Sequence, residues 1–253
     1  MATNLNPSQS LQRDEDQNEE HEAGQPPFRS PQFLGALTCI GLGLNIAAAV
    51  AALSLQFAFE GTEGAPQGDY AETVDGPGKL AIWMAFADMA LQLLRILTGV
   101  LFVAWTYRVH CNLLALGHKE LDFKPIAGVV VWFIPLVGLV LPCLVMREIA
   151  WRSDPQAENL GRDNRSLVLV NWWWRTFLVS PVTFLIQLLI PESLEALSSD
   201  VAFRWNIMLY LTVIVSGVLA CWLILRINAQ QAERLRLLQD QRIHPLSRPS
   251  AID

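Results

Sequence analysis

Five long apolar runs interrupt an otherwise polar chain. They cover Phe33–Phe59, Leu80–Tyr107, Ile126–Met146, Leu167–Ile190 and Asn206–Leu225. Each run reaches or approaches the roughly 20 residues that an α-helix needs to cross a bilayer. Apolar residues occupy all sides of these runs, which is typical of helices that face lipid. The pattern predicts an all-α integral membrane protein.

The third run differs from the others because prolines and glycines interrupt it. Lys124-Pro125 precedes it, Gly128 and Gly138 lie within it, and Pro135 and Pro142 each remove a helical hydrogen bond. A break at Pro135 leaves two arms of about ten residues, each about 15 Å long as a helix. This length favours a re-entrant or interfacial hairpin. The alternative is a kinked but complete fifth span, since proline also occurs in transmembrane helices.

Positive charges separate these two topologies, because cytoplasmic loops are enriched in lysine and arginine. Five spans divide these residues eleven to six between the two sides. Four spans plus a hairpin leave only Lys79 and Arg204 outside, with Arg95 inside the second span. We therefore expect four transmembrane helices, a Pro-broken hairpin, and both termini in the cytoplasm.

Composition agrees with a membrane protein and suggests three regions. Charged residues make up 17% of the 253 residues, against about 25% in soluble domains. The first residues are polar and acidic, unlike the basic start of a signal peptide, and are expected to be disordered. The predicted organisation is an acidic tail over 1–32, a helical membrane domain over 33–225, and a cytoplasmic helix and tail over 226–253.

Candidate chemistry is sparse. The four cysteines are scattered and contain no CxxC pair, so we interpret them as packing residues. His110 and Cys111 are adjacent and would point in different directions on a helix, so we expect neither a metal site nor a cofactor. No phosphate loop, zinc-protease helix or serine elbow is present, and no basic block points to nucleic acid.

Three polar residues in the second run share one helical face. Asp88, Gln92 and Arg95 are spaced at i, i+4 and i+7. A charge at mid-membrane costs about 2.5–3.5 kcal/mol on insertion scales unless it is paired or hydrated. These residues are either a structural ladder, with Gln92 bridging the two charges, or an intramembrane polar site that contacts a ligand.

A second set of candidates surrounds the predicted hairpin. Glu148 follows the second proline on a short amphipathic helix, where it could pair with Arg108 or Arg175 and hold the hairpin against the bundle. Asn112 could hydrogen-bond the bend of the hairpin. The full set of candidates for this structural motif is Arg108, Asn112, Pro135, Pro142, Arg147 and Glu148.

Three further features predict contacts with lipid or partners. Trp172, Trp173, Trp174 and Arg175 are typical of an interfacial anchor. Gly43, Ala47 and Ala51 form a small-residue face that packs within the monomer or forms a homo-oligomer. The stretch INAQQAERLRLLQDQR extends the last span into a basic helix that lies on anionic lipid or docks a cytoplasmic protein.

Several of these residues together form a recognisable pattern. Its positions are Trp105, Tyr107, Arg108, Asn112, Leu116, Gly117, Phe133, Pro135, Leu139, Pro142, Arg147, Glu148, Ile149 and Ser153. Through them, Ala104–Ser153 resembles the bacterial membrane family catalogued as domain of unknown function 4328. The tryptophans at 172–174 and the stretch Arg226–Gln231 extend the resemblance. Gly138 and the apolar residues around Pro142 depart from the family pattern.

The resemblance implies a location in the bacterial cytoplasmic membrane but no reaction. The tails and anchors are clearer than any site, so the leading interpretation is a non-enzymatic scaffold or regulatory partner. The alternative is a small transporter or channel-like protein that uses Asp88, Gln92 and Arg95 together with the hairpin.

Overall fold

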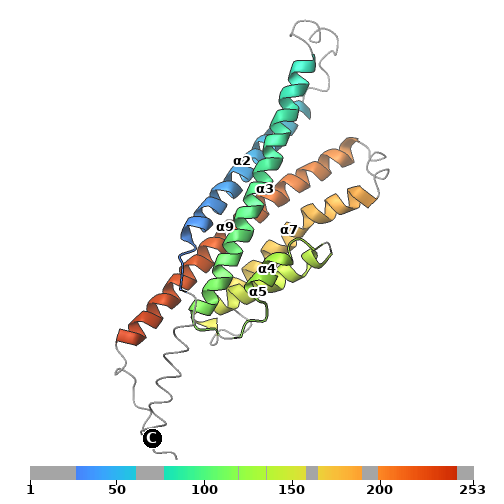
Figure 1. Cartoon of the computed structure of the whole chain (residues 1–253). Coiled ribbons are helices and arrows are strands. Elements are labelled where there is room, and N and C mark those ends of the chain that lie inside the picture. Colours follow the sequence, from blue (N-terminus) through green and yellow to red (C-terminus); the bar gives the residue numbers. More distant parts are fainter. Residues whose placement is uncertain are drawn as a thin grey trace, which may run out of the picture.

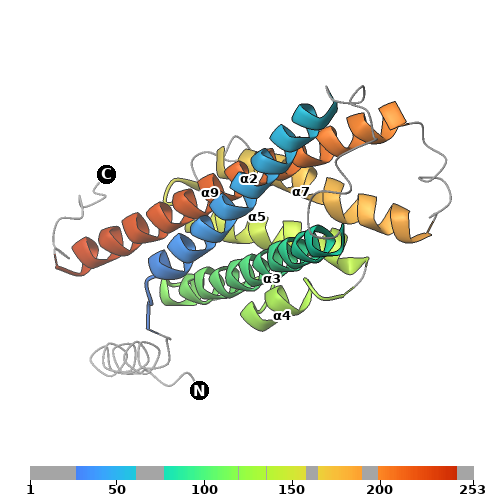
Figure 2. The same ribbon diagram turned by 90° about the horizontal axis from the view of Figure 1, so that it is seen from above.

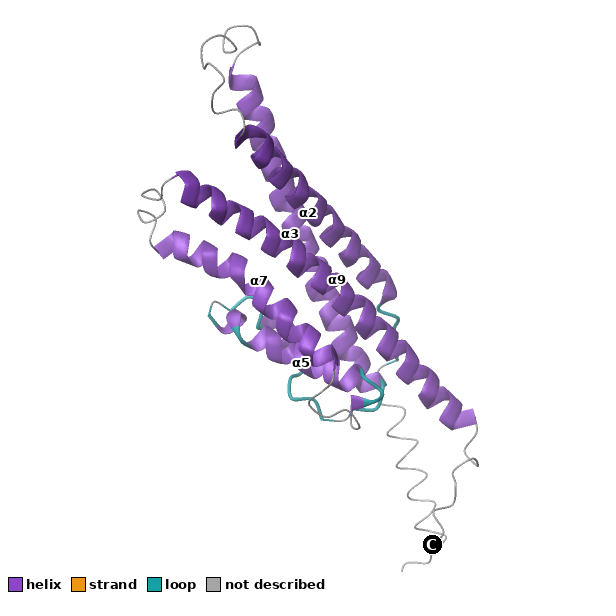
Figure 3. Ribbon diagram, turned by 180° about the vertical axis from the view of Figure 1, so that it is seen from behind, coloured by secondary structure: helices purple, strands orange, loops and turns teal. Residues whose placement is uncertain are grey.

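The described part of the chain is helical. The computed structural model describes residues 27–60, 77–118, 120–134, 136–157, 165–189 and 199–243, and these contain no β-strand (Figure 3). The helices are α2 (Gln32–Glu60), α3 (Pro77–Ala115), α4 (Pro125–Val130), the short 3₁₀ helix η1 (Val137–Leu139), α5 (Leu141–Ser153), α7 (Arg165–Leu189) and α9 (Ser199–Ile243) (Figure 1).

Three of the described helices are long and apolar enough to cross a membrane. The candidate spans are Gln32–Phe57 in α2, Ala85–Ala115 in α3 and Phe203–Gln241 in α9. Most of their apolar side chains face outward, which suits a lipid environment. The chain is therefore a multi-pass membrane protein.

The third apolar run does not form one helix. It is divided into α4, a turn around η1, and α5. Leu136 in this turn has a φ of 65°, which is unusual for a residue with a side chain. The predicted break is confirmed, although Pro135 itself lies outside the described residues. Pro142 stands in the first turn of α5, so it starts a helix instead of interrupting one.

The hairpin formed by α4, η1 and α5 packs against three of the long helices. α9 packs along both α2 and α7, while α3 packs on α2. α5 contacts α7, α3 and α9, and α4 lies on α3 (Figure 2). The hairpin therefore contacts both α3 and α7, which also meet directly through Phe102 and Trp173. Toward the top of Figure 1, α2 and α3 diverge from α7 and α9.

Backbone geometry ends α3 sharply, and this positions the loop that follows it. Gly117 adopts a left-handed φ of 90°. Its N–H donates to the carbonyl of Leu114 at 3.1 Å, and the N–H of His118 donates to that of Leu113 at 3.1 Å. This pair of bonds is a Schellman cap, which favours glycine at the left-handed position.

The largest fully buried side chains gather where the hairpin meets the long helices. They include Trp105, Leu113, Met146, Ile149, Leu223, Ile224 and Ile227. Within a bilayer, burying apolar surface gives helices little reason to associate, so close packing and hydrogen bonds must hold them together. The packed core therefore occupies one end of the bundle.

The last helix is much longer than the predicted span over Asn206–Leu225. α9 continues without interruption past Arg226 to Ile243. Ile227, Asn228, Gln230 and Gln231 are all buried against the rest of the bundle. The first part of the predicted C-terminal region is thus packed onto the membrane domain.

Glycine allows α2 to approach α9. A Cβ on Gly35 would lie 2.5 Å from Asn228 Nδ2 and 3.0 Å from Ile224 Cγ2. A Cβ on Gly43, in the same helix, would meet nothing within 4 Å. The close approach of α2 to α9 therefore depends on Gly35 and not on Gly43.

We predict that Gly35→Ala destabilises the protein by about 1–3 kcal/mol, the usual cost of overpacking. Gly43→Ala is the matched control, expected to be neutral or to stabilise by up to about 1 kcal/mol, because alanine favours helix. Thermal unfolding in detergent, followed by tryptophan fluorescence, measures both. Equal transition temperatures for the two variants would contradict the α2–α9 contact.

Candidate functional site

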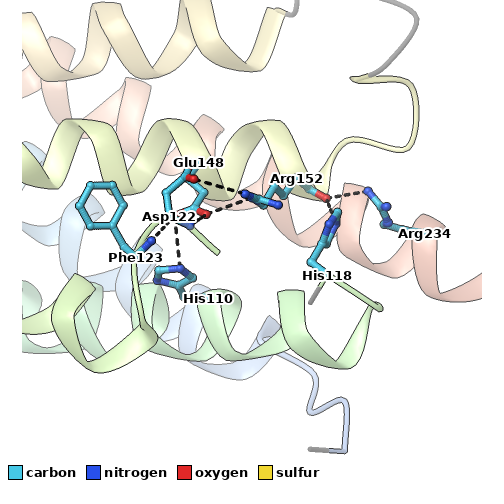
Figure 4. A network of polar contacts seen from close by, with 7 residues as sticks. All are labelled: His110, His118, Asp122, Phe123, Glu148, Arg152 and Arg234. Carbon is cyan, nitrogen blue, oxygen red and sulfur yellow. Dashed lines mark hydrogen bonds and ion pairs between the residues drawn. The ribbon is translucent and has the colours of Figure 1, made fainter. Parts of the chain in front are cut away.

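A buried carboxylate organises the inner end of the bundle. Glu148 lies on α5 with 7% of its surface exposed. Its carboxylate accepts the backbone N–H groups of Asp122 at 2.7 Å and Phe123 at 3.2 Å. Arg152, one helical turn later, places Nε 3.0 Å from Glu148 Oε1 (Figure 4). Charge and hydrogen bonds thus compensate for the burial of Glu148.

The arginine of this pair connects α5 to its surroundings. Its guanidinium lies 3.7 Å from the Asp122 carboxylate. Its backbone carbonyl accepts the guanidinium of Arg234 at 2.7 Å and lies 2.9 Å from His118 Nε2 (Figure 4). The end of α5 is therefore held by α9 and by the loop that follows α3.

His110 completes the environment of Glu148. This histidine is 1% exposed, and its Nε2 lies 3.7 Å from Glu148 Oε2, which is too long for a hydrogen bond. Within the described residues, this nitrogen has no hydrogen-bond partner. A Cβ on Gly128 would lie 2.9 Å from its Nδ1, so α4 packs directly on the ring.

A second chain of buried amides joins four segments. Asn112 Nδ2 donates to the carbonyl of Arg29 at 2.9 Å and to Gln231 Oε1 at 3.2 Å. The N–H of Arg29 donates to Asn112 Oδ1 at 3.2 Å. Gln231 Nε2 donates to Ser153 Oγ at 3.1 Å and to the Val109 carbonyl at 2.9 Å. The segment before α2 is thus tied to α3, α5 and α9.

Three further hydrogen bonds connect α9 to α7 and to α3 at this inner end. Arg226 Nε and Gln230 Nε2 donate to Ser166 Oγ at 2.7 and 3.0 Å. Trp105 Nε1 donates to Asn228 Oδ1 at 3.0 Å. We call the contacts centred on Glu148, Gln231 and Ser166 the inner polar network.

Two expected pairings are wrong. Glu148 pairs with Arg152, one turn later on the same helix, and lies near His110. Neither Arg108 nor Arg175 is among its described contacts. Asn112 binds the Arg29 backbone and Gln231 rather than the bend of the hairpin, since it lies beside the segment that precedes α2. Arg147 is exposed and donates to Asn171 Oδ1 at 3.3 Å.

A cavity lies beyond the network, between the long helices. Its volume is about 710 Å³, within the range of ligand pockets. Residues of α2, α3, α7, α9 and the hairpin turn line it. Its aromatic part comprises Phe102, Trp132, Phe133, Trp173 and Phe177. Its polar part comprises Asn45, Arg95, Thr98, Ser180, Thr183, Asn206, Tyr210 and Ser216.

Edge-on and tilted ring pairs form the aromatic part of the cavity wall. Phe102 lies 5.6 Å from Trp132 and 5.4 Å from Trp173 between ring centroids, and Trp173 lies 5.7 Å from Phe177. These distances are typical of favourable aromatic pairs. The indole nitrogen of Trp132 is buried and has no hydrogen-bond acceptor among the described residues. The hairpin thus supplies one side of the cavity.

The polar residues predicted on the second span occupy different surroundings. All three side chains are exposed, but only Arg95 lines the cavity, and Asp88 and Gln92 are not part of its wall. The described contacts include no hydrogen bond from Gln92 to either charge, so the structure does not contain the bridging ladder considered above. Only the arginine of the three is therefore placed at a cavity.

The tryptophan motif is divided between two environments. Trp173 and Trp174 are 3% and 6% exposed and belong to the core. Trp172 is 55% exposed, and the guanidinium carbon of Arg175 lies 5.4 Å from its ring centroid. Only Trp172 and Arg175 are thus placed to meet a membrane interface.

The small-residue face of α2 also points outward. Gly43, Ala47 and Ala51 are all exposed in the monomer. The inward face instead carries Gly35, Gly41 and Asn45, whose amide donates to Thr98 Oγ1 at 3.1 Å.

In the described residues, no group of three or more His, Cys, Asp or Glu side chains could hold a metal ion.

Sequence reasoning missed the cavity and the roles of Gln231, Asn228 and Ser153. A signal existed, because Trp105, Asn112 and Ser153 belong to the family-like pattern and Gln231 ends the basic stretch after the last span. A polar residue deep in an apolar helix needs a partner. Nothing in one sequence, however, indicates which residues form each pair.

The fold and the network define a multi-pass helical membrane protein whose helices are joined at one end. The family model described as Domain of unknown function (DUF4328) matches residues 79–229, so the chain belongs to that family. Comparisons with curated proteins and with solved structures gave no match.

We predict that Glu148→Ala costs about 1–3 kcal/mol, the usual cost of leaving hydrogen-bonding groups without their partner. The substitution removes the acceptor of two partly buried backbone N–H groups and of Arg152, whose side chain is 23% exposed. Chemical unfolding in mixed micelles measures this loss.

Glu120→Ala is the control for this experiment. Glu120 is exposed and lies in the same loop region, so its replacement should change stability by less than about 0.5 kcal/mol. An equally small effect of Glu148→Ala would show that the network does not hold the hairpin.

Proposed function

We propose that the protein is a non-enzymatic, four-span protein of the bacterial cytoplasmic membrane that binds a ligand inside its bundle. α7 supplies the fourth span, since its 25 residues extend about 37 Å as a helix and hydrocarbon is about 30 Å thick. α4 and α5 form a re-entrant hairpin whose two ends face the cytoplasm. This topology is the one favoured by the positive charges of the sequence.

The inner polar network supports this topology. It joins the segment before α2, the end of α3, the end of α5 and the later half of α9. The chain must therefore return to the same side between the end of α3 and the end of α5. Arg29, Arg152, Arg226 and Arg234 all belong to this end, as expected for a cytoplasmic face.

The observation that carries the proposed binding function is the cavity itself. It combines aromatic residues with a few convergent polar groups, which is the usual composition of a ligand site. Its described lining contains no Asp, Glu, His or Cys, so binding has more support than acid–base or nucleophilic catalysis. Of the three polar residues that the sequence suggested as an intramembrane site, the proposed ligand site therefore includes only Arg95.

A scaffold role is the second candidate, because α9 projects beyond the network. Arg236, Leu237, Gln239 and Asp240 are exposed on this projection, with Leu237 presenting an apolar side chain to solvent. A cytoplasmic protein could dock there, and Gly43, Ala47 and Ala51 could pair two copies. A scaffold needs no ligand in the cavity, and this difference separates the two candidates.

We predict that cysteines introduced at Glu120 and Gln156 react with impermeant maleimide only after the cytoplasmic side is opened. Both positions are exposed and flank the hairpin. The experiment uses a variant that lacks the four native cysteines, in spheroplasts and in inverted vesicles. Labelling of the two positions from opposite sides would contradict the hairpin and favour a fifth span.

We predict that Gly99→Trp reduces the amount of ligand that copurifies with the protein at least tenfold. Gly99 lines the cavity, and a Cβ there meets nothing within 4 Å, so the indole fills the cavity without a clash at its base. Mass spectrometry of organic extracts measures the retained molecules against protein amount.

Gly43→Trp is the matched control, since it adds the same side chain at an open position outside the cavity. It should retain as much ligand as the unmodified protein. Equal retention by Gly99→Trp, or an empty unmodified protein, would contradict ligand binding and leave the scaffold candidate.

A further inference from the structure

The cavity contains one formal charge. Of the described residues that line it, only Arg95 is ionised at neutral pH. The described contacts include no hydrogen bond or ion pair to its guanidinium. The other polar groups are uncharged, and Asn45 and Thr98 already bind each other and carbonyls of their own helices. The guanidinium donors of Arg95 are therefore available to a bound molecule.

The depth of Arg95 makes this charge costly. Within the candidate span Ala85–Ala115, Arg95 lies about 15 Å from the first residue and about 30 Å from the last. Arg95 is therefore inside the span, nearer to its start than to its end. An arginine at the centre of a membrane helix costs about 2.5 kcal/mol or more unless an anion or water compensates it.

The aromatic wall and the rim define the rest of the bound molecule. Ile96 and Val100 on α3 are 64% and 58% exposed, and Phe133 of the hairpin turn is 71% exposed. All three line the cavity. The rim that these side chains form is thus apolar and, in a four-span bundle, faces lipid.

We infer that the cavity binds an anionic amphiphile that enters sideways from the bilayer. A carboxylate or phosphate headgroup pairs with Arg95, whose planar guanidinium matches both groups with two parallel hydrogen bonds. Asn206 and Tyr210 supply neutral donors in the same cavity. The apolar chain lies against Phe102, Trp132 and Phe177. This inference rests on the proposed binding function and identifies its ligand class.

The test uses the full chain in lipid nanodiscs made of zwitterionic phospholipid. A palmitic acid analogue with a diazirine near its chain end is photolysed with the protein, and labelled peptides are identified by mass spectrometry. Unlabelled competitors are palmitate, dodecyl phosphate, methyl palmitate and butyrate. They separate the carboxylate and phosphate headgroups from the apolar chain and from the bare anion.

We expect saturable labelling of residues in the cavity wall. Palmitate, dodecyl phosphate or both should compete, whereas the uncharged ester and the short anion should be at least tenfold weaker. Arg95→Gln should weaken apparent affinity at least tenfold, and Arg95→Lys should weaken it less because the charge remains. Arg204→Gln removes the same group from an exposed position outside the cavity and should have no effect.

Two results would overturn the inference in distinguishable ways. Equal competition by methyl palmitate would mean that the cavity recognises only the chain, so anion recognition fails while ligand binding stands. This comparison uses the unmodified protein and does not depend on the folding of any variant. An absence of saturable labelling in the cavity, together with an empty copurified protein, would overturn the proposed function as well.

Discussion

The buried carboxylate of Glu148 is the interaction on which the rest of the structure depends. A hairpin that turns back inside a bilayer gains little from apolar contacts, because lipid offers similar ones. Glu148 instead binds the backbone of the loop after α3 and the guanidinium of Arg152. The same arginine's carbonyl receives Arg234 from α9. The Glu148 carboxylate and the neighbouring Arg152 thereby hold the hairpin, the end of α3 and the last helix relative to one another.

This arrangement gives the two ends of the bundle different properties. At the inner end, side-chain hydrogen bonds join α3, α5, α7, α9 and the segment before α2, and the largest side chains are fully buried. Beyond this end, a cavity of about 710 Å³ lies between the helices. The hairpin contributes Trp132 and Phe133 to its wall, so the network that holds the hairpin also shapes the cavity.

The apolar runs, and the prolines and glycines that interrupt them, predicted much of the fold. The lengths of the runs predicted the helices, and the prolines predicted the break between α4 and α5. Local patterns could not predict the partners of Glu148 and Asn112, because those contacts join residues far apart in the sequence. They also could not separate Trp172, which faces outward, from Trp173 and Trp174, which are buried. Neighbouring residues on a helix point in different directions, and only packing decides which of them lipid meets. Arg95 was identified by its cost in a membrane, but the cavity beside it is a tertiary feature.

The proposed ligand site depends on Arg95 meeting an anionic headgroup inside the bundle. The most direct measurement is a cryo-electron microscopy structure of the full chain in nanodiscs containing palmitate. We expect chain density along Phe102, Trp132 and Phe177 that ends in a headgroup within about 3 Å of the guanidinium, a normal distance for charge-assisted hydrogen bonds. A closed or empty cavity, with Arg95 paired to a side chain of the protein, would contradict it.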